Sequence, residues 1–258
     1  TLSSSVAVAD GKLTTQVDSS SGAYRARLRR CGLIYKGLCG QRCEALAAAP
    51  ARDGKVHYTH GSVPRRGHAA AFPLSSLAKK QPTVLVICGP DQNGSIGLVC
   101  ARHLRMYEYE PTIYHPQRSS QSLHQDFTVQ CEKMDIPSLS YLPTELINDA
   151  YNLVIDAMMG PDADCANLRE PYPGILVTLK QIKIPIASVD VPSGWDVEEP
   201  SQDGINPEVL ISLTAPKKCA ISFSGKHFLA GRFLPYDIQK KYDLNLPDYP
   251  GTDCLIEL

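Results

Sequence analysis

Apolar runs alternate with amphipathic stretches along most of the chain after residue 82. The segment TVLVICG at 83–89 is a continuous apolar run that ends in glycine, which is the pattern of a strand buried in a parallel sheet. The next stretch repeats its apolar positions at the spacing of one helix face: Ile96, Val99, Cys100, His103 and Leu104. The pattern therefore predicts a strand followed directly by a helix.

The same alternation continues to about residue 217. It predicts, in chain order, a strand at PTIYHP (111–116), a helix over roughly 122–133, a short IPSLSYL segment, a strand at LVIDAMMG (153–160), a helix near 172–181, and strands at PIASVDVPSG (185–194) and VLISLTAPK (209–217). Repeated β-α-β crossovers imply right-handed connections. The fold class we expect is α/β: a Rossmann-like, doubly wound, mostly parallel sheet with helices on both faces.

Charge divides the chain into two unlike parts. Residues 1–80 hold 13 Lys or Arg against 4 Asp or Glu, whereas residues 81–258 hold 13 against 23. We therefore predict a basic N-terminal extension over 1–67, disordered or divergent, and an α/β domain over 68–258. A basic, serine-rich leader is also typical of a mitochondrial transit peptide or of an arm that binds an anionic partner.

Composition narrows the class of protein. With 258 residues and 43% hydrophobic side chains, the chain suits one large globular domain with an extension. Since no apolar run reaches the roughly 18 residues that cross a bilayer, we expect no transmembrane segment. We also expect no nucleic-acid partner. Nine cysteines, an odd number in a chain of this length, favour a reducing compartment over a disulfide framework, and Cys88, Cys100 and Cys219 are expected to be buried.

Three motifs are expected to meet at the carboxyl ends of the strands, where doubly wound sheets bind their ligands. GPDQNGSIG (89–97) follows the first strand, Asp156 lies near the end of LVIDAMMG, and Asp190 and Ser193 lie at the end of ASVDVPSG.

The glycine-marked turn matches neither a Walker loop nor a G-x-G-x-x-G fingerprint, because Gly89, Gly94 and Gly97 are spaced differently. Free backbone N–H groups at the helix start would favour an anion such as a phosphate, with Asn93 or Ser95 capping the helix or donating. A capping turn without a ligand explains the pattern equally well.

The two aspartates end apolar strands, where an unpaired carboxylate would be costly. Oxygen atoms of Asp156, Ser193 and Asn93 would suit a hard cation, and Asp190 would suit general acid–base catalysis. The alternative is that both aspartates cap helices or accept hydrogen bonds from backbone N–H groups.

Several motifs resemble one family over about residues 68–258. They are GPDQNGSIGLVCARHL, YEPTIYHP, CEKMDIP, VIDA, VDVPSGWDVE, LISLTAPK and GRFLP, and they resemble the YjeF N-terminal domain, the family of NAD(P)H-hydrate epimerase, also known as apolipoprotein A-I binding protein. The resemblance implies a Rossmann-like fold and interconversion of the two epimers of NAD(P)HX. It also implies a potassium ion at Asn93, Asp156 and Ser193, a catalytic Asp190, and substrate contacts at the following positions: Gln92, Asn93, Gly94, Ser95, Ile96, Gly160 and Asp190.

Departures from the family pattern fall in the same region. The family turn reads G-P-G-N-N-G-G-D-G, whereas this chain has Asp91, Gln92, Ser95 and Ile96 at four of those positions, and the last change replaces a carboxylate. The loop after Asp156 adds two acids, Asp162 and Asp164, which would repel a diphosphate if they faced it and would do little on a solvated loop. Residues 1–67 show no counterpart to the family's leading helices.

Two functions follow from the resemblance. The departures favour a catalytically weakened or inactive paralogue that acts by binding, for which the resemblance implies apolipoprotein A-I or HDL as partner and a part in cholesterol efflux. The alternative is an active epimerase with bound potassium and NAD(P)HX as substrate. The resemblance also implies a homodimer and is compatible with secretion. The cysteine usage and the basic leader instead predict a cytoplasmic or mitochondrial location.

Overall fold

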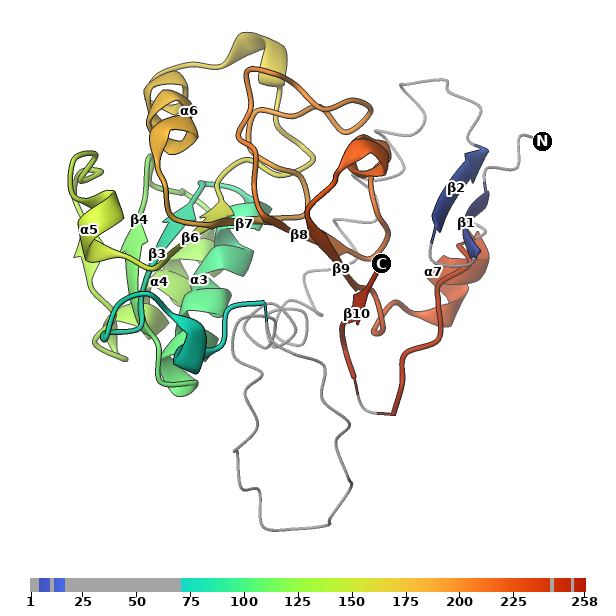
Figure 1. Cartoon of the computed structure of the whole chain (residues 1–258), viewed down its shortest axis with the longest axis horizontal. Helices are drawn as coiled ribbons and strands as arrows, with labels where there is room; N and C mark the ends of the chain where they lie inside the picture. The colour runs from blue at the N-terminus through green and yellow to red at the C-terminus, as the bar shows by residue number, and fades with distance from the viewer. Residues whose placement is uncertain (1–4, 10–11, 17–70, 242–243, 252) are drawn as a thin grey trace.

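The computed structural model describes residues 5–9, 12–16, 71–241, 244–251 and 253–258. Its centre is an eight-stranded sheet in the order β10-β9-β8-β7-β6-β3-β4-β5 (Figure 1). The strands are β3 (Thr83–Cys88), β4 (Glu110–Tyr114), β5 (Ser138–Leu139), β6 (Leu153–Ala157), β7 (Ile186–Val189), β8 (Val209–Leu213), β9 (Lys226–Ala230) and β10 (Ile256–Glu257). All neighbouring pairs are parallel except β9 with β10. The mostly parallel sheet expected from the sequence is confirmed.

Helices cover both faces of this sheet. The helices are α3 (Gln92–Met106), α4 (Ser122–Glu132), α5 (Ile147–Ala150), α6 (Tyr172–Gln181) and α7 (Tyr236–Lys241), with short 3-10 turns η2 (Leu74–Ser76), η3 (Cys165–Asn167) and η4 (Lys218–Ser222). Helices α3 and α4 lie side by side and pack into one apolar core, whereas α5 and α6 pack into a second core (Figure 1). The doubly wound α/β fold is therefore confirmed.

Burial explains why the central strands read as continuous apolar runs. Every residue of β6, β7 and β8 is buried, and so are five of the six residues of β3. Strands that are covered on both faces do not alternate apolar with polar residues. Asp156 on β6, Ser188 on β7 and Ser212 on β8 are polar exceptions, and all three are completely buried.

The strand order reverses between β3 and β6. From β3 the chain proceeds outward to β4 and β5, then returns to the other side of β3 as β6. In such sheets the crevice for a ligand lies outside the carboxyl ends of the strands at this reversal. Because Cys88 at the end of β3 pairs with Ala157 at the end of β6, the turns that follow both strands start at the same level.

Some described elements were absent from the sequence prediction. They are the four-residue α5, the C-terminal β9, α7 and β10, and an antiparallel pair formed by β1 (Ser5–Ala9) and β2 (Lys12–Gln16). Most of the predicted extension over 1–67 lies outside the described residues, so its division from the α/β domain stays a prediction.

Two expectations from composition are confirmed within the described residues. No helix there is long and apolar enough to cross a membrane. Cys88, Cys100 and Cys219 are at most 1% exposed and carry free thiols, as expected for small buried apolar side chains.

Candidate functional site

The turn after β3 brings the start of α3 against the edge of the sheet. Asn93 and Ser95 are buried in the first helical turn. A Cβ atom added to Gly94 would lie 1.8 Å from the carbonyl oxygen of Gly89, so this close packing requires glycine. Asp91 precedes the helix and makes no capping hydrogen bond with its side chain. The prediction that Asn93 or Ser95 caps the helix is wrong, because both residues lie inside the helix and Asp91 occupies the N-cap position.

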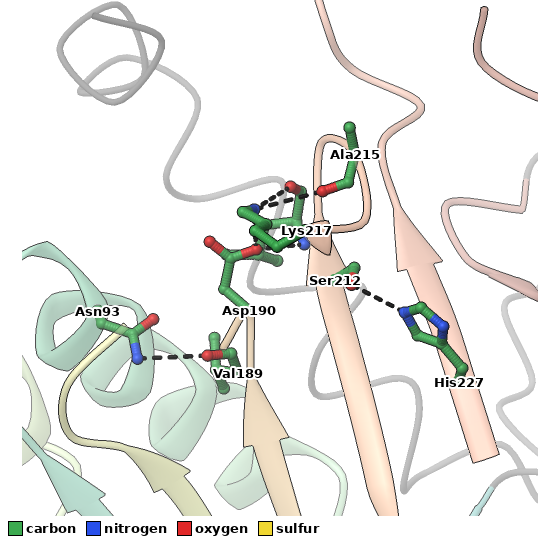
Figure 2. A network of polar contacts seen from close by, with 8 residues as sticks. Asn93, Val189, Asp190, Ser212, Ala215, Lys217 and His227 are labelled. Carbon is green, nitrogen blue, oxygen red and sulfur yellow. Dashed lines mark hydrogen bonds and ion pairs between the residues drawn. The ribbon is translucent and has the colours of Figure 1, made fainter. Parts of the chain in front are cut away.

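Asn93 connects the helix start to two other strands. Its Nδ2 atom donates to the carbonyl oxygen of Val189 at the end of β7, at 3.4 Å (Figure 2). Gly160, three residues beyond β6, has a φ of 72°, and a Cβ atom there would lie 2.9 Å from the Asn93 side chain. The predicted site residues Asn93 and Gly160 are thus in direct proximity.

Asp156 accepts four hydrogen bonds. Its Oδ1 atom accepts from the Ser193 hydroxyl at 2.6 Å and from the Met158 N–H at 3.2 Å. Its Oδ2 atom accepts from the Ser188 hydroxyl and the Ser193 N–H, both at 2.9 Å. Since a carboxylate has about four acceptor sites, this network uses all of them.

Burial raises the pKa of Asp156, and the four hydrogen bonds lower it only in part. No Lys or Arg among the described residues forms an ion pair with this carboxylate. The Ser193 hydroxyl, which donates to Asp156, also accepts from the Met159 N–H at 3.2 Å. Asp156 and Ser193, predicted as ligands of one cation, therefore lie in hydrogen-bond contact, and the Asp156 carboxyl group has no Lys or Arg partner among the described residues.

Asp190 forms a buried ion pair with Lys217 (Figure 2). Its Oδ1 atom accepts from Lys217 Nζ and from the Leu213 N–H, the latter at 2.9 Å. Lys217 Nζ also donates to the carbonyl oxygens of Leu213 and Ala215. The side chains of the pair are 5% and 8% exposed, so the ammonium group and the carboxylate are held almost entirely by each other and by backbone groups.

The second carboxylate oxygen of Asp190, Oδ2, accepts no hydrogen bond from the described residues. Figure 2 shows it directed away from Lys217. Asp190 itself has a φ of 68°, in the left-handed region that side chains rarely adopt. Strained backbone of this kind is concentrated at functional sites.

The remaining predicted substrate positions differ in their surroundings. Gln92 is half-buried at the helix start. Ile96 is 4% exposed and packs into the apolar core between α3 and the sheet. Asp162 and Asp164 are exposed on the loop after β6, and Asp164 accepts a hydrogen bond from Asn167 at 3.0 Å. Because the loop is solvated, salt screens the charges of these two carboxylates. They are therefore expected to have little effect on a bound diphosphate.

Two histidines lie at the same edge, beyond the turn after β3. The rings of His115, which follows β4, and His124 on α4 are 5.6 Å apart. His124 Nε2 hydrogen-bonds the carbonyl oxygen of Gly89 at 3.0 Å, whereas neither ring nitrogen of His115 has a hydrogen-bond partner among the described residues. Burial, together with His124 and Arg118, lowers the pKa of His115 to about 4.

Substituting His115 with Phe is expected to flatten the pH dependence of stability below neutrality. The ordinary histidine pKa is 6.5, so the unfolded chain binds more protons than the folded chain between pH 6.5 and 4, and stability falls as pH is lowered through that window. We expect His115→Phe to remove about 1 kcal/mol of that loss, because the ring is partly exposed. Urea unfolding at several pH values measures this, and an unchanged slope would contradict it.

Sequence patterns gave no indication of Lys217 or His115 as site residues. Lys217 lies in the TAPK motif, but its contact with Asp190 spans 27 positions of the chain and depends on the parallel pairing of β7 with β8. His115 lies in the predicted strand segment PTIYHP, where nothing marks it as unpartnered. No group of three or more His, Cys, Asp or Glu able to hold a metal occurs in the described part, so a cation would depend on amide, hydroxyl and carboxylate oxygens.

The chain is similar to known proteins over most of its length. Residues 63–219 match the family described as YjeF-related protein N-terminus. The zebrafish protein (Danio rerio) named YjeF N-terminal domain-containing 3 is 77% identical over 200 residues, which covers 74% of this chain and 81% of that protein. The human YjeF N-terminal domain-containing protein 3 is 53% identical over 235 residues, which covers 85% of this chain and 79% of that protein. The solved structure of the yeast protein ynu0 matches with a TM-score of 0.72 and 32% identity, covering 94% of this chain and 100% of that one.

Proposed function

Since the chain belongs to the family of YjeF-related protein N-termini, we propose that it binds NAD(P)HX, a hydrated nicotinamide dinucleotide, and that Asp190 exchanges a proton with the hydrated ring. The binding site is the edge of the sheet where β3, β6 and β7 end. The reaction is the interconversion of the two NAD(P)HX epimers. It is the activity that the sequence resemblance implies.

The observation that carries this proposal is the state of Asp190. Its Oδ1 atom is fixed by Lys217 and by the Leu213 N–H, while Oδ2 is left without a partner among the described residues. A carboxylate oriented through one oxygen presents the other for proton transfer. The Lys217 ammonium group compensates the negative charge while Asp190 is ionised, so the carboxylate can act first as a base.

The start of α3 supports binding of the diphosphate. Backbone N–H groups in the first turn of a helix have no carbonyl partner within it, and together with the helix dipole they favour a phosphate. Gly94 allows the turn and the helix start to pack without an intervening side chain. The diphosphate would then lie beside Gln92 and Ser95, with the hydrated ring toward Asp190.

The side chains at this edge also fit a potassium ion. A buried carboxylate without a cationic partner provides the charge, and the Ser193 hydroxyl and the Asn93 amide provide oxygen atoms of the type that hard cations bind. Because the four acceptor sites of Asp156 are already used, Asn93 and Ser193 would hold the ion directly and Asp156 would compensate its charge from behind Ser193. A bound potassium ion would supply positive charge that orders the ends of β6 and β7.

Potassium is expected to raise the melting temperature of the protein through Ser193. Any ion that binds only the folded state stabilises it, so raising KCl from zero to about 100 mM, with choline chloride keeping ionic strength constant, should raise the melting temperature by a few degrees. Adding NADHX should raise it further. In Ser193→Ala the potassium effect should be lost, whereas the buried control Ser212→Ala should keep it. Equal potassium effects in both variants would contradict the assignment.

The second candidate is a binding protein with weakened catalysis. The placement of Ile96 favours it, because this side chain is buried in the core at a position where the resemblance implies an aspartate at the ligand-facing turn. Apolipoprotein A-I or HDL binding, a role in cholesterol efflux, and a homodimer rest on the resemblance. Retention of apolipoprotein A-I by the immobilised protein, with no melting-temperature shift from NADHX, would favour this candidate.

A further inference from the structure

Asp190 lies at the centre of a three-residue turn that ends β7. The Val191 N–H donates to the carbonyl oxygen of Val189 at 2.9 Å, and Asp190 between them has a φ of 68°. A hydrogen bond from a residue to the second residue before it, with a positive φ between the two, is that of a rare and strained form of γ-turn. A strained turn persists only where the surrounding contacts determine its conformation. The contacts around this turn therefore decide where the carboxylate lies.

Contacts from β8 and the loop after it hold one side of the turn. The Asp190 N–H donates to the Ile211 carbonyl oxygen at 2.8 Å. Its Oδ1 atom accepts from the Leu213 N–H and from Lys217. These three contacts fix the backbone and Oδ1 of Asp190, but none of them reaches the Val189 carbonyl oxygen, at which the turn begins.

The Asn93 side chain holds that carbonyl group. Its Nδ2 atom donates to the Val189 oxygen at 3.4 Å, so this oxygen accepts from the turn and from α3 together (Figure 2). Asn93 is 5% exposed and lies in the first turn of a 15-residue helix. Gly160 adjoins it closely, because a Cβ atom there would lie 2.9 Å from the Asn93 side chain. An amide group enclosed in this way on a rigid element has little freedom to leave the carbonyl group.

We propose that Asn93 is a positioning residue for Asp190: its amide N–H₂ group fixes the Val189 carbonyl group and thereby the direction of Asp190 Oδ2. The inference rests on the proposed function, in which this carboxylate exchanges a proton with the hydrated ring. Because a displacement of about 1 Å from the productive geometry costs about 10²-fold in rate, one hydrogen bond at the turn affects turnover without touching the substrate. Asn93 acts here through Nδ2, and its Oδ1 atom remains available to the potassium ion proposed above.

Asn93→Asp tests the donor separately from the amide oxygen. The change keeps the size of the side chain and one acceptor oxygen, but it replaces the N–H₂ group with a second oxygen that faces the Val189 carbonyl group. Epimerisation of NADHX in potassium buffer should show kcat lower by about 10- to 100-fold and KM changed by less than about 3-fold, because positioning of Asp190 affects the chemical step and not substrate binding. Asn93→Ala introduces no charge and should also lower kcat, so it replaces Asn93→Asp if that variant does not fold.

Hydrogen exchange gives a second measurement that does not depend on turnover. The Val191 N–H closes the turn, so its exchange rate, followed by nuclear magnetic resonance, should rise about 10-fold in both Asn93 variants. The Val154 N–H, which donates to Pro185 before the start of β7, should keep its rate. A local loosening of the turn is thereby distinguished from a loosening of the whole strand.

Asn152 provides the matched control. It has the same side chain and the same 5% exposure, but it lies before the start of β6, at the opposite edge of the sheet. Its Nδ2 atom donates to the Gln81 carbonyl oxygen at 2.6 Å, and its Oδ1 atom accepts from the Lys79 N–H at 2.8 Å. Asn152→Ala should therefore lower the melting temperature at least as far as Asn93→Ala does, while leaving kcat and the Val191 exchange rate unchanged.

The outcomes separate this inference from the nucleotide proposal. Full kcat in both Asn93 variants, or a fall in kcat with an unchanged Val191 exchange rate, would overturn the positioning role and leave the epimerase proposal intact. Absence of turnover in the unmodified chain would overturn the epimerase proposal. In that case the role of Asn93 at the turn is decided by the Val191 exchange rate alone, and an unchanged rate would overturn it.

Discussion

Lys217→Met is expected to destabilise the fold by about 3 to 5 kcal/mol at neutral pH. Removing one partner of a buried ion pair leaves the other charge without compensation in a site that is largely shielded from water. Asp190 is then held only by the Leu213 N–H, and its carboxylate is 8% exposed. Urea unfolding followed by circular dichroism measures the change.

The adjacent lysine provides the matched control for this experiment. Lys218 pairs with Glu198 at 3.2 Å, but its side chain is 37% exposed, so Lys218→Met should cost at most about 1 kcal/mol. The double variant Asp190→Asn/Lys217→Met should recover most of the stability lost in Lys217→Met, because no charge is then left unpaired. A cost for Lys217→Met no larger than that for Lys218→Met would contradict the buried pair.

Asp156→Asn is expected to cost about 2 to 4 kcal/mol of folding stability. The change preserves size but replaces one acceptor oxygen with an N–H₂ group, which then faces a hydroxyl and a backbone N–H. Either orientation of the amide leaves the N–H of Met158 or of Ser193 without its acceptor, and a buried unsatisfied donor carries its full desolvation cost.

Ser188→Ala is the milder comparison for Asp156→Asn. It removes one of the four hydrogen bonds to the carboxylate and leaves both backbone donors paired, so it should cost about 1 kcal/mol. Equal costs for Asp156→Asn and Ser188→Ala in the same unfolding assay would show that the network contributes no more than a single hydrogen bond.

The fold was predictable from the sequence where burial determines the pattern. Strands β3, β6 and β8 are mostly apolar, with Asp156 and Ser212 as buried exceptions, because helices cover both faces. In α3, the residues Ile96, Val99, Cys100 and Leu104 of the predicted apolar face are buried. Strand β9 was not predicted because it begins Lys-His, and β10 is only two residues long. Such short or mixed segments become strands through pairing with a neighbour, which no local pattern reports.

The site was predictable in its position but not in its contacts. Parallel strands place their carboxyl ends at one edge, so Asp156, Asp190 and Ser193 were expected there. Which donors each carboxylate uses depends on turn geometry. Lys217 lies beside a second lysine, a pattern that predicts an exposed side chain. It is buried because the chain folds back after β8 toward Asp190.

Epimerisation of purified S- and R-NADHX in potassium buffer tests the central claim most directly. With Asp190 as the proton-exchanging group, the protein should interconvert the epimers, and Asp190→Asn should lower the rate by a factor of about 10² to 10⁴ while the variant remains folded. The folded state of the variant can be checked by its near-ultraviolet circular dichroism. Turnover in Asp190→Asn equal to that of the unmodified chain, or no turnover in either, would contradict the assignment of epimerase chemistry to this carboxylate.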